Sequence, residues 1–137
     1  MIDNCIEIRV RYADTDQMKV AYYSQYLIWF ECGRTELLRE IGYPYSRLEA
    51  EGIILPVIEA WCQYHKPARY DEVLTVRTTL PNLPRVKLRL DYQIFRSEPH
   101  EMLARGYTVH AFLNSEGRPV RPPKAFLEIL KSYFETN

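Results

Sequence analysis

An antiparallel β-sheet wrapped around one long helix is the α+β fold that the sequence predicts. The stretch from Tyr26 to Ile41 is apolar nearly all round in its first turns, which is typical of a helix enclosed by other structure. After residue 54, apolar residues recur at every second position, which is the period of strands with one buried face. The connections between these segments are short, so we expect antiparallel neighbours.

The predicted elements follow one another without a linker or an internal repeat. The segment Ile6 to Tyr12 alternates apolar and charged residues and predicts the first strand. A polar and aromatic loop, 13–24, leads into the long helix, and Gly42 with the following Pro44 predicts where that helix ends. A polar connection, 45–52, comes before the strand-rich part of the chain.

Strand periodicity continues from there to residue 113, and a small helix follows. The expected strands are 55–66, a segment with Leu74, Val76, Thr78 and Leu80 on one face, a segment with Val86, Leu88, Leu90, Tyr92 and Ile94 on one face, and 102–113. Pro122 and Pro123 open the terminal helix. A curved sheet of this kind has open edges, so we expect strand pairing between subunits.

Length and composition predict one globular domain over residues 1–137. The chain is 47% hydrophobic and 26% charged, which are ordinary values for a protein with a packed core. Eighteen basic residues balance eighteen acidic ones, so no broad field attracts nucleic acid, and no nucleic-acid partner is expected.

Cysteine usage and the N-terminus predict a cytoplasmic location. The three cysteines form no CxxC pair, which fits a reducing compartment. The N-terminal sequence has no basic and apolar signal-peptide pattern, and no apolar run is long enough to span a bilayer. We therefore expect a soluble protein without an integral membrane segment.

The loop before the long helix is the strongest candidate for chemistry. Asp14 and Asp16 lie shortly before the helix, whose free backbone N–H groups can stabilise an oxyanion. A carboxylate on the same loop could activate water or attack an acyl carbonyl. The residues alone leave a second interpretation open, in which the two aspartates only cap the helix or brace the turn.

The stretch YADTDQMKVAYYSQYLIWFECGRTELLREIG resembles the signature of the 4-hydroxybenzoyl-CoA thioesterase family. More narrowly, it is similar to the bacterial acyl-CoA thioesterases associated with the Tol-Pal gene cluster. A second match runs from Leu55-Pro56-Val57 through the segment 64–72, so the resemblance covers most of the chain, from Ile8 to about Pro123.

The resemblance implies a hot-dog fold and the hydrolysis of an acyl-CoA thioester (EC 3.1.2.-). It implies dimers or dimers of dimers, such as a homotetramer, with active sites at subunit interfaces. It identifies Asp16 as the catalytic carboxylate, acting as general base or nucleophile, and the backbone N–H of Tyr23 as the oxyanion donor. The Tyr23 phenol, with an ordinary pKa of about 10, is expected to position the substrate or water. No cofactor is expected, because coenzyme A is part of the substrate.

Lys19 departs from the family pattern, which usually has glycine at this position. If the backbone needs a positive φ there, a lysine costs roughly 1 kcal/mol or more. If the glycine only makes room, the lysine could narrow or charge the acyl pocket.

Further residues are candidates for substrate binding. Arg85 lies where the resemblance implies cations for the coenzyme A phosphates, and Lys87 and Lys66 extend the set. Tyr22 and Tyr26 could line an acyl pocket. The three histidines, including His110 in the last strand, lack metal-ligand spacing, so no metal site is expected.

Other functions are less consistent with the sequence. A hot-dog dehydratase needs a histidine near the central helix, and no histidine comes before position 65. A serine hydrolase needs a G-x-S-x-G elbow, which the chain lacks. The remaining alternative is a non-catalytic protein that binds or scaffolds acyl thioesters.

Overall fold

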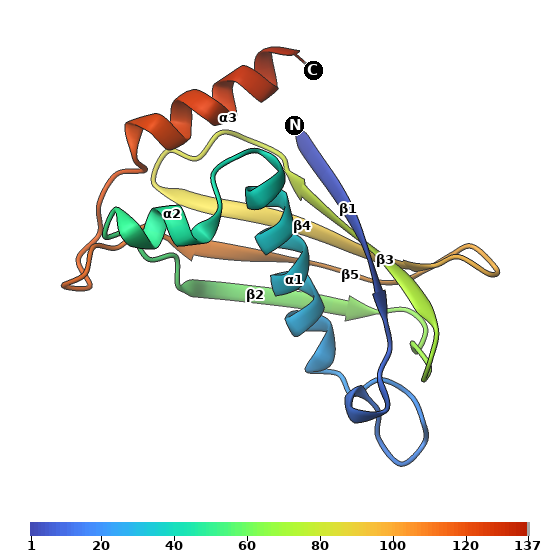
Figure 1. The fold of residues 1–137 in the computed structure, drawn as a ribbon. Coiled ribbons are helices and arrows are strands. Elements are labelled where there is room, and N and C mark those ends of the chain that lie inside the picture. Colours follow the sequence, from blue (N-terminus) through green and yellow to red (C-terminus); the bar gives the residue numbers. More distant parts are fainter. Residues whose placement is uncertain (137) are drawn as a thin grey trace.

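A computed structural model describes residues 1–136, so Asn137, the last residue of the predicted domain, lies outside the described residues. Five strands form one sheet in the order β1-β3-β4-β5-β2, and all neighbours are antiparallel (Figure 1). The elements are β1 (Ile2–Arg9), the 3-10 turn η1 (Tyr12–Asp14), α1 (Gln25–Glu40), α2 (Tyr45–Ala50), β2 (Val57–Tyr64), β3 (Val73–Leu80), β4 (Lys87–Arg96), β5 (Glu101–Ala111) and α3 (Lys124–Thr136).

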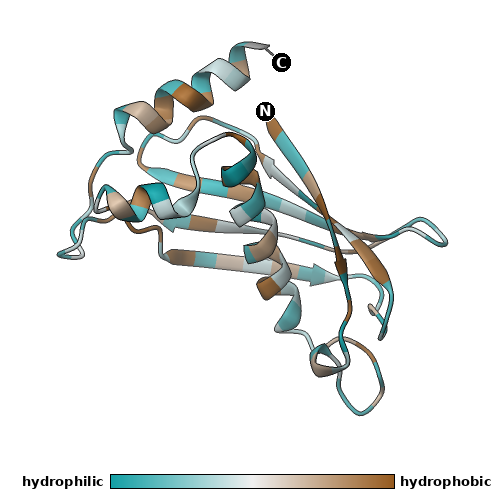
Figure 2. Cartoon of the chain, viewed as in Figure 1, coloured by the Kyte–Doolittle hydropathy of each residue, from teal (hydrophilic) through white to brown (hydrophobic). Residues whose placement is uncertain are grey.

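The helix α1 lies across one face of the sheet, and the main core is between them (Figure 1). Alternate residues of β3 and β4 are buried beneath it, which gives the banded hydropathy of the strands in Figure 2. The ring of Phe30 on α1 stacks on that of Tyr92 on β4, with 4.3 Å between the ring centroids. The predicted sheet wrapped around a long helix is therefore confirmed.

Gly33 allows α1 to lie unusually close to the sheet. A Cβ atom at this position would be only 2.2 Å from the Oγ1 of Thr78 and 3.1 Å from a methyl group of Val76. Real Cβ atoms do not come so close, so any side chain at position 33 would push the helix away from β3. The glycine therefore sets the spacing between the helix and the sheet.

The smaller helices α2 and α3 cover the core near the C-terminal end of α1 (Figure 1). Gly42, with φ +85°, ends α1 as the sequence predicts. The short helix α2 was not predicted, because its six residues lie in a stretch that reads as a polar connection. The helix α3 packs through buried Phe126, whose ring lies 5.1 Å from that of Tyr43.

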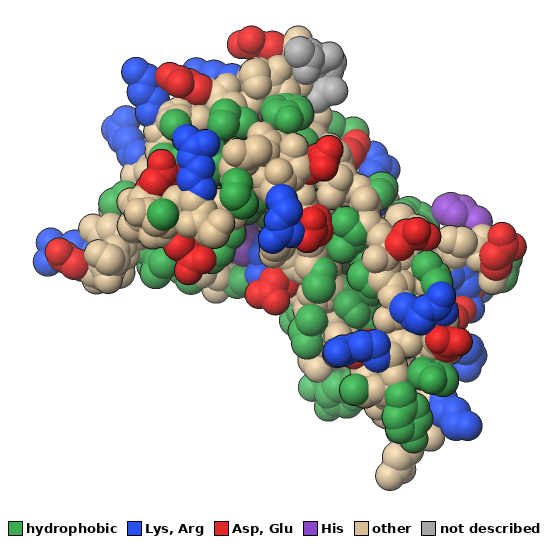
Figure 3. Space-filling model, in the orientation of Figure 1, with side chains coloured by type: hydrophobic (Ala, Val, Ile, Leu, Met, Phe, Trp, Pro, Cys, Tyr) green, Lys and Arg blue, Asp and Glu red, His purple; other side chains and the backbone are tan. Residues whose placement is uncertain are grey.

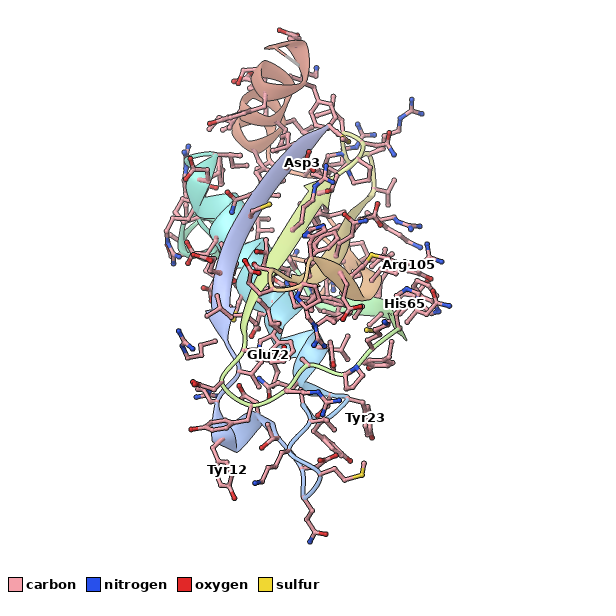
Figure 4. All side chains as sticks on the ribbon, turned by 90° about the vertical axis from the view of Figure 1, so that its right-hand side faces the viewer. Asp3, Tyr12, Tyr23, His65, Glu72 and Arg105 are labelled. Atoms are coloured by element: carbon pink, nitrogen blue, oxygen red, sulfur yellow. The ribbon has the colours of Figure 1, made fainter. Side chains whose placement is uncertain are left out.

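The strand register fixes which segments lie at each end of the sheet. Arg9 pairs with Val73, and Ile2 pairs with Leu80. The loop 10–24 therefore lies at the same end as the start of β3 and the end of β4, whereas the connection between β3 and β4 lies at the opposite end. In Figure 4, Tyr12, Tyr23 and Glu72 mark the first end, and Asp3 lies toward the second.

Three local predictions are wrong. The first strand runs from Ile2 to Arg9 and not from Ile6 to Tyr12, because its pairing with β3 extends to the start of the chain. Val86 precedes β4 and is 70% exposed, so it does not share the buried face of Leu88. The first turns of α1 are not enclosed on all sides, because Ile28 is 49% exposed. None of the helices described within residues 1–136 is long and apolar enough to cross a membrane.

Candidate active site

Asp14 holds the loop 10–24 in shape. Its carboxylate is buried and accepts hydrogen bonds from the backbone N–H of Arg11 (2.8 Å) and from the Arg11 guanidinium (2.9 Å). Its carbonyl oxygen accepts the N–H of Tyr22 at 2.9 Å. Both ends of the loop are therefore tied to one residue, which agrees with the bracing role expected for Asp14.

Asp16 starts a tight hairpin within this loop. Its backbone N–H donates to the carbonyl of Val20 (3.0 Å), and its carbonyl accepts the N–H of Lys19 (3.0 Å). The carboxylate Oδ1 accepts the N–H of Met18 at 2.8 Å. Among residues 1–136, the other carboxylate oxygen makes no hydrogen bond, and no cation pairs with the carboxylate. The half-buried Asp16 therefore keeps one oxygen free for a proton or an acyl carbon.

Lys19 occupies the turn of this hairpin with φ +64°, in the left-handed region. The family pattern usually has glycine here, either because the backbone needs a positive φ or because a side chain would not fit. The structure supports the first explanation, since the turn has a positive φ. A lysine in this conformation costs about 1 kcal/mol. The hairpin is nevertheless closed by the bonds between Asp16, Lys19 and Val20, so the substitution does not disrupt it.

The start of α1 leaves backbone donors free beside this loop. Gln25 donates to the carbonyl of Tyr22 at 2.9 Å, and the side chain of Ser24 does not cap the helix. The N–H of Tyr23 has no hydrogen-bond partner within the part of the chain that the structure describes. This N–H lies at the positive end of a 16-residue helix, where a developing negative charge is stabilised.

Two tyrosines fix the position of Tyr23. The hydroxyl of Tyr64 donates to the carbonyl of Tyr23 at 2.9 Å, and the Tyr64 ring meets the Tyr26 ring edge to face. Burial raises the pKa of Tyr64 to about 12, so the phenol keeps the proton that it donates. Tyr26 is buried, and its hydroxyl accepts the N–H of Ala68 at 3.1 Å.

The predicted tyrosines thus lie in different surroundings. Tyr26 braces the start of the helix, whereas Tyr22 and Tyr23 are exposed, with ring centroids 4.5 Å apart. Contact with the Tyr23 hydroxyl raises the pKa of Tyr22. An open groove of about 340 Å³ lies here, lined by Ala21, Tyr23, Tyr26, Tyr64, His65, Lys66 and Pro67. The residues that line this groove do not include Asp16.

The segment 67–72 supports the loop from the other side. Ala21 donates to the carbonyl of Ala68 (2.8 Å), and Asp71 donates to that of Val10 (2.9 Å). The segment is held in turn by Arg96, which donates to the carbonyl of Pro67 (2.6 Å) and pairs with Glu72 (3.1 Å).

Arg96 was not identified from the sequence. Its Nε lies 3.2 Å from a carboxylate oxygen of Glu101 but is not aimed at it for a hydrogen bond, so that contact is ionic only. The nearest signal in the sequence was the second family match, 64–72, which contains part of this support.

The predicted coenzyme A residues fall into two places. Lys66 lines the groove at Tyr23 and pairs with Glu101 at 2.9 Å. Arg85 and Lys87 are exposed at the opposite end of β4, without an ion pair to any other described residue. The length of β4 separates them from the Asp16 end by about 30 Å. One chain therefore does not bring Arg85 and Lys87 together with Asp16.

No metal centre is apparent in the described part of the chain. Across residues 1–136, no three histidine, cysteine, aspartate or glutamate side chains gather as metal ligands would. The free carboxylate oxygen of Asp16 and the free N–H of Tyr23 are the candidate reactive groups at this end of the sheet.

The sheet order, the central helix and the loop before it define a hot-dog protein. The sequence pattern described as "Thioesterase-like superfamily" matches residues 10–130. The chain belongs to this family.

Individual relatives agree with that assignment. The chain is 36% identical over 121 residues to YneP of Bacillus subtilis, whose name assigns it provisionally as an acyl-CoA thioesterase; the match covers 88% of this chain and 87% of YneP. A solved structure of a DHNA-CoA thioesterase from Staphylococcus aureus is 31% identical, with a TM-score of 0.90, covering 99% of this chain and 91% of that one.

A more distant structure shares the fold alone. The 4-hydroxybenzoyl CoA thioesterase from Pseudomonas sp. strain CBS-3 is 20% identical, with a TM-score of 0.84 over 94% of this chain and 99% of its own. The predicted family and the hot-dog fold are therefore confirmed. The Tol-Pal association stays a prediction.

Proposed function

We propose that the chain hydrolyses an acyl-CoA thioester, with Asp16 as the reacting carboxylate and the start of α1 as the oxyanion site. The observation that carries the proposal is that one loop, tied at both ends, has both a free carboxylate oxygen on Asp16 and a free N–H on Tyr23. The names of the relatives support the coarser assignment to acyl-CoA hydrolysis.

In this mechanism the thioester carbonyl oxygen accepts a hydrogen bond from the N–H of Tyr23. Asp16 takes a proton from a water molecule, whose oxygen bonds to the carbonyl carbon. The negative charge that develops on the carbonyl oxygen is stabilised by the helix end. The carbon–sulfur bond then breaks, and the coenzyme A thiolate takes the proton from Asp16.

The alternative use of Asp16 is direct attack on the carbonyl carbon. This attack gives a mixed anhydride and releases the thiolate, and water then hydrolyses the anhydride. A single turnover in heavy-oxygen water, followed by mass spectrometry of the peptide containing Asp16, tests for hydrolysis of the anhydride at the Asp16 carbonyl. Label in Asp16 excludes a mechanism that uses it only as a base.

The largest effect is expected from Asp16→Asn. An amide can neither take the proton nor form the anhydride, so kcat/KM should fall at least a hundredfold, in line with the usual contribution of a general base. Free thiol release from a panel of aliphatic and aromatic acyl-CoAs measures this loss. Asp71→Asn is the matched control, because among residues 1–136 its exposed carboxylate pairs only with Arg9.

An unchanged rate in Asp16→Asn contradicts the mechanism. Binding of acyl-CoA without turnover in the wild-type protein contradicts hydrolysis and favours the non-catalytic scaffold.

We also propose that two chains pair through the edge strand β2. This strand is exposed along nearly its whole length, and Val57, Ile58 and Trp61 are 41–49% exposed. Leu27 and Ile28 add exposed apolar surface on the adjacent part of α1. Figure 3 shows a hollowed face on the molecule with hydrophobic side chains along it. A long, apolar, unpaired edge of this kind needs a partner strand.

Antiparallel pairing of β2 with its copy would bring opposite ends of the two sheets together. The partner's Arg85 and Lys87 would then lie about three strand spacings, roughly 14 Å, from the end of β2. Light scattering should give at least twice the chain mass of 16.3 kDa. A monomer at micromolar concentration contradicts this assembly.

A further inference from the structure

The peptide group that carries the free N–H of Tyr23 is held by the start of α1. The carbonyl of this peptide group belongs to Tyr22, and it accepts the N–H of Gln25 at 2.9 Å. The N–H of Tyr22 donates in turn to the carbonyl of Asp14. The plane of the free N–H is therefore held through the first turn of the helix and through the loop.

The next peptide group, between Tyr23 and Ser24, is not held by the helix. Ser24 is the N-cap of α1, and an N-cap carbonyl is the first that accepts a helical N–H. The carbonyl of Tyr23 lies one residue earlier, and no backbone N–H of residues 1–136 donates to it. Its partner is the hydroxyl of Tyr64, at the end of β2, which donates to it at 2.9 Å. A side chain from another element thus supplies the donor that the backbone lacks.

The surroundings of Tyr64 keep its hydroxyl aimed at the loop. A carbonyl oxygen can only accept, so the hydroxyl is the donor in this bond. Burial and the neighbouring thiol of Cys62 raise the pKa of Tyr64 to about 12, so the phenol stays protonated. Its ring meets that of buried Tyr26 edge to face, with 4.9 Å between the ring centroids. The ring is therefore held in place while the hydroxyl reaches the carbonyl of Tyr23.

The two hydrogen-bonded peptide groups meet at the Cα of Tyr23. A peptide group is planar, so the backbone at this residue can change only by rotation of the two planes about the Cα. The bond to Gln25 holds one plane, and the bond from Tyr64 holds the other. An oxyanion donor must point at the developing charge, and a misplacement of about 1 Å can cost on the order of a hundredfold in rate. The second bond therefore matters for the reaction even though it lies outside the reacting atoms.

We propose, on the basis of the thioesterase function above, that Tyr64 is a positioning residue: its hydroxyl holds the Tyr23–Ser24 peptide so that the N–H of Tyr23 points at the thioester carbonyl oxygen in the transition state. Tyr64 acts through the backbone of Tyr23 and takes no part in proton transfer. It comes from a strand 41 residues further along the chain. The oxyanion site thus depends on a contact between α1 and β2, and the loop alone does not complete it.

Tyr64→Phe removes the hydroxyl and keeps the ring against Tyr26. We expect kcat to fall about tenfold, which is the size expected for one hydrogen bond, while KM stays within about twofold of the wild type. A purely structural role would lower the Tm instead, and a direct contact between the hydroxyl and the bound substrate would raise KM. A kcat within about twofold of the wild type overturns the proposal.

Tyr107→Phe is the matched control. The hydroxyl of Tyr107 also donates to a residue of β2, the carboxylate of Glu59. The neighbouring Gly106 faces Phe30 of α1, so the side chain of Tyr107 lies on the other face of the sheet. This variant should keep the kcat and the KM of the wild type. An equal loss of kcat in both variants would assign the effect to the stability of β2 and overturn the proposal.

A difluorotyrosine in place of Tyr64 tests the same hydrogen bond without removing the hydroxyl. Fluorine atoms on the ring lower the pKa of the phenol, and a phenolate has no proton to donate to the carbonyl of Tyr23. The ratio of its kcat to that of the wild type should fall at least threefold between about pH 7 and pH 9.5. The other titratable groups around this hydroxyl are the same in both proteins: the thiol of Cys62, the phenols of Tyr23 and Tyr26, the imidazole of His65 and the amine of Lys66. A ratio that does not change with pH overturns the proposal.

The NMR signal of the Tyr23 N–H separates this inference from the proposed function. The signal should shift in Tyr64→Phe and stay in place in Tyr107→Phe, and an unchanged signal in both overturns the inference. Normal turnover in Tyr64→Phe with loss of turnover in Asp16→Asn also overturns it and leaves the thioesterase intact. If the wild type hydrolyses no acyl-CoA, the proposed function fails, and a shifted signal still assigns Tyr64 as the residue that holds this N–H.

Discussion

The two ends of the sheet differ in how much of their structure a single chain completes. At the Asp16 end, the loop 10–24 is tied by Asp14, by the segment 67–72 and by Tyr64, so its backbone is already held in place. At the other end, Arg85 and Lys87 are exposed and unpaired with any other described residue. Under the function proposed above, the difference predicts that one chain positions the reacting carboxylate, whereas contacts to the coenzyme A phosphates need a second chain.

Among substitutions at the Asp16 end of the sheet, Arg96→Gln should destabilise the protein most. In Arg96→Gln, Glu72 and Glu101 lose their shared cation, and the segment 67–72 loses its anchor. We expect a loss of about 2–3 kcal/mol in the free energy of unfolding, less than for a fully buried pair because Arg96 is slightly exposed. Urea denaturation measures it, and Arg118→Gln, in an exposed pair, should cost under about 1 kcal/mol. Similar losses in both variants would contradict the special role of Arg96.

Mixed dimers can show whether the two ends meet across the subunit interface. The double change Arg85→Ala with Lys87→Ala should raise KM about tenfold, as expected for loss of charge-assisted contacts to phosphate. When this double variant is mixed with Asp16→Asn chains, activity should return. In each mixed dimer, one site then has a wild-type Asp16 from one chain and wild-type Arg85 and Lys87 from the other. Coenzyme A release is the measurement. Activity equal to the sum of the two separate variants would argue that both ends serve sites within one chain.

Replacing Lys19 by glycine should change the free energy of unfolding by less than Arg96→Gln does, and in the opposite direction. Lys19→Gly removes the cost of a left-handed lysine, so stability should rise by about 1 kcal/mol. Lys19→Ala keeps a Cβ atom and should gain almost nothing. Thermal unfolding of the wild type, Lys19→Gly and Lys19→Ala measures these differences. Equal stabilities would show that the turn is unstrained.

The smallest expected effect is the contribution of His110 to the pH dependence of stability. Burial lowers its pKa in the folded protein, so the folded state binds fewer protons than the unfolded chain. Its contribution to stability is therefore present above the ordinary pKa of about 6.5 and is lost as the pH falls, by at most about 1.4 kcal/mol per pH unit. Between pH 7.5 and 5.5, His110→Gln should therefore lose less stability than the wild type.

The sequence was sufficient for most of the fold because its signals are local. Alternation along β3, β4 and β5 and the glycine after α1 depend only on near neighbours in the chain. The start of β1 was misplaced because its pairing with Leu80 is a long-range contact. The six-residue α2 was missed because so short a helix has little periodicity.

The candidate site was predictable only where it lies in one segment. Asp16 and Tyr23 are on the same loop, so one motif identifies both. Arg96 was missed because its carbonyl partner, Pro67, lies 29 residues away. Arg34 was missed because residues that line the same cavity of about 270 Å³, Leu88 and His110, come from strands that the sequence does not place opposite α1.

Gly33 has a consequence for redesign of the protein. Because the contact between this residue and Thr78 sets the height of the helix above the sheet, it also sets the height of the α1 residues that form the roof of the cavity of about 270 Å³ lined by Arg34, Leu38 and Leu88. Substitutions at Leu38 or Leu88 can then enlarge or fill the space while the scaffold keeps its shape. A bulky residue at position 33 would lift the roof, and no choice of lining residues would restore the original space.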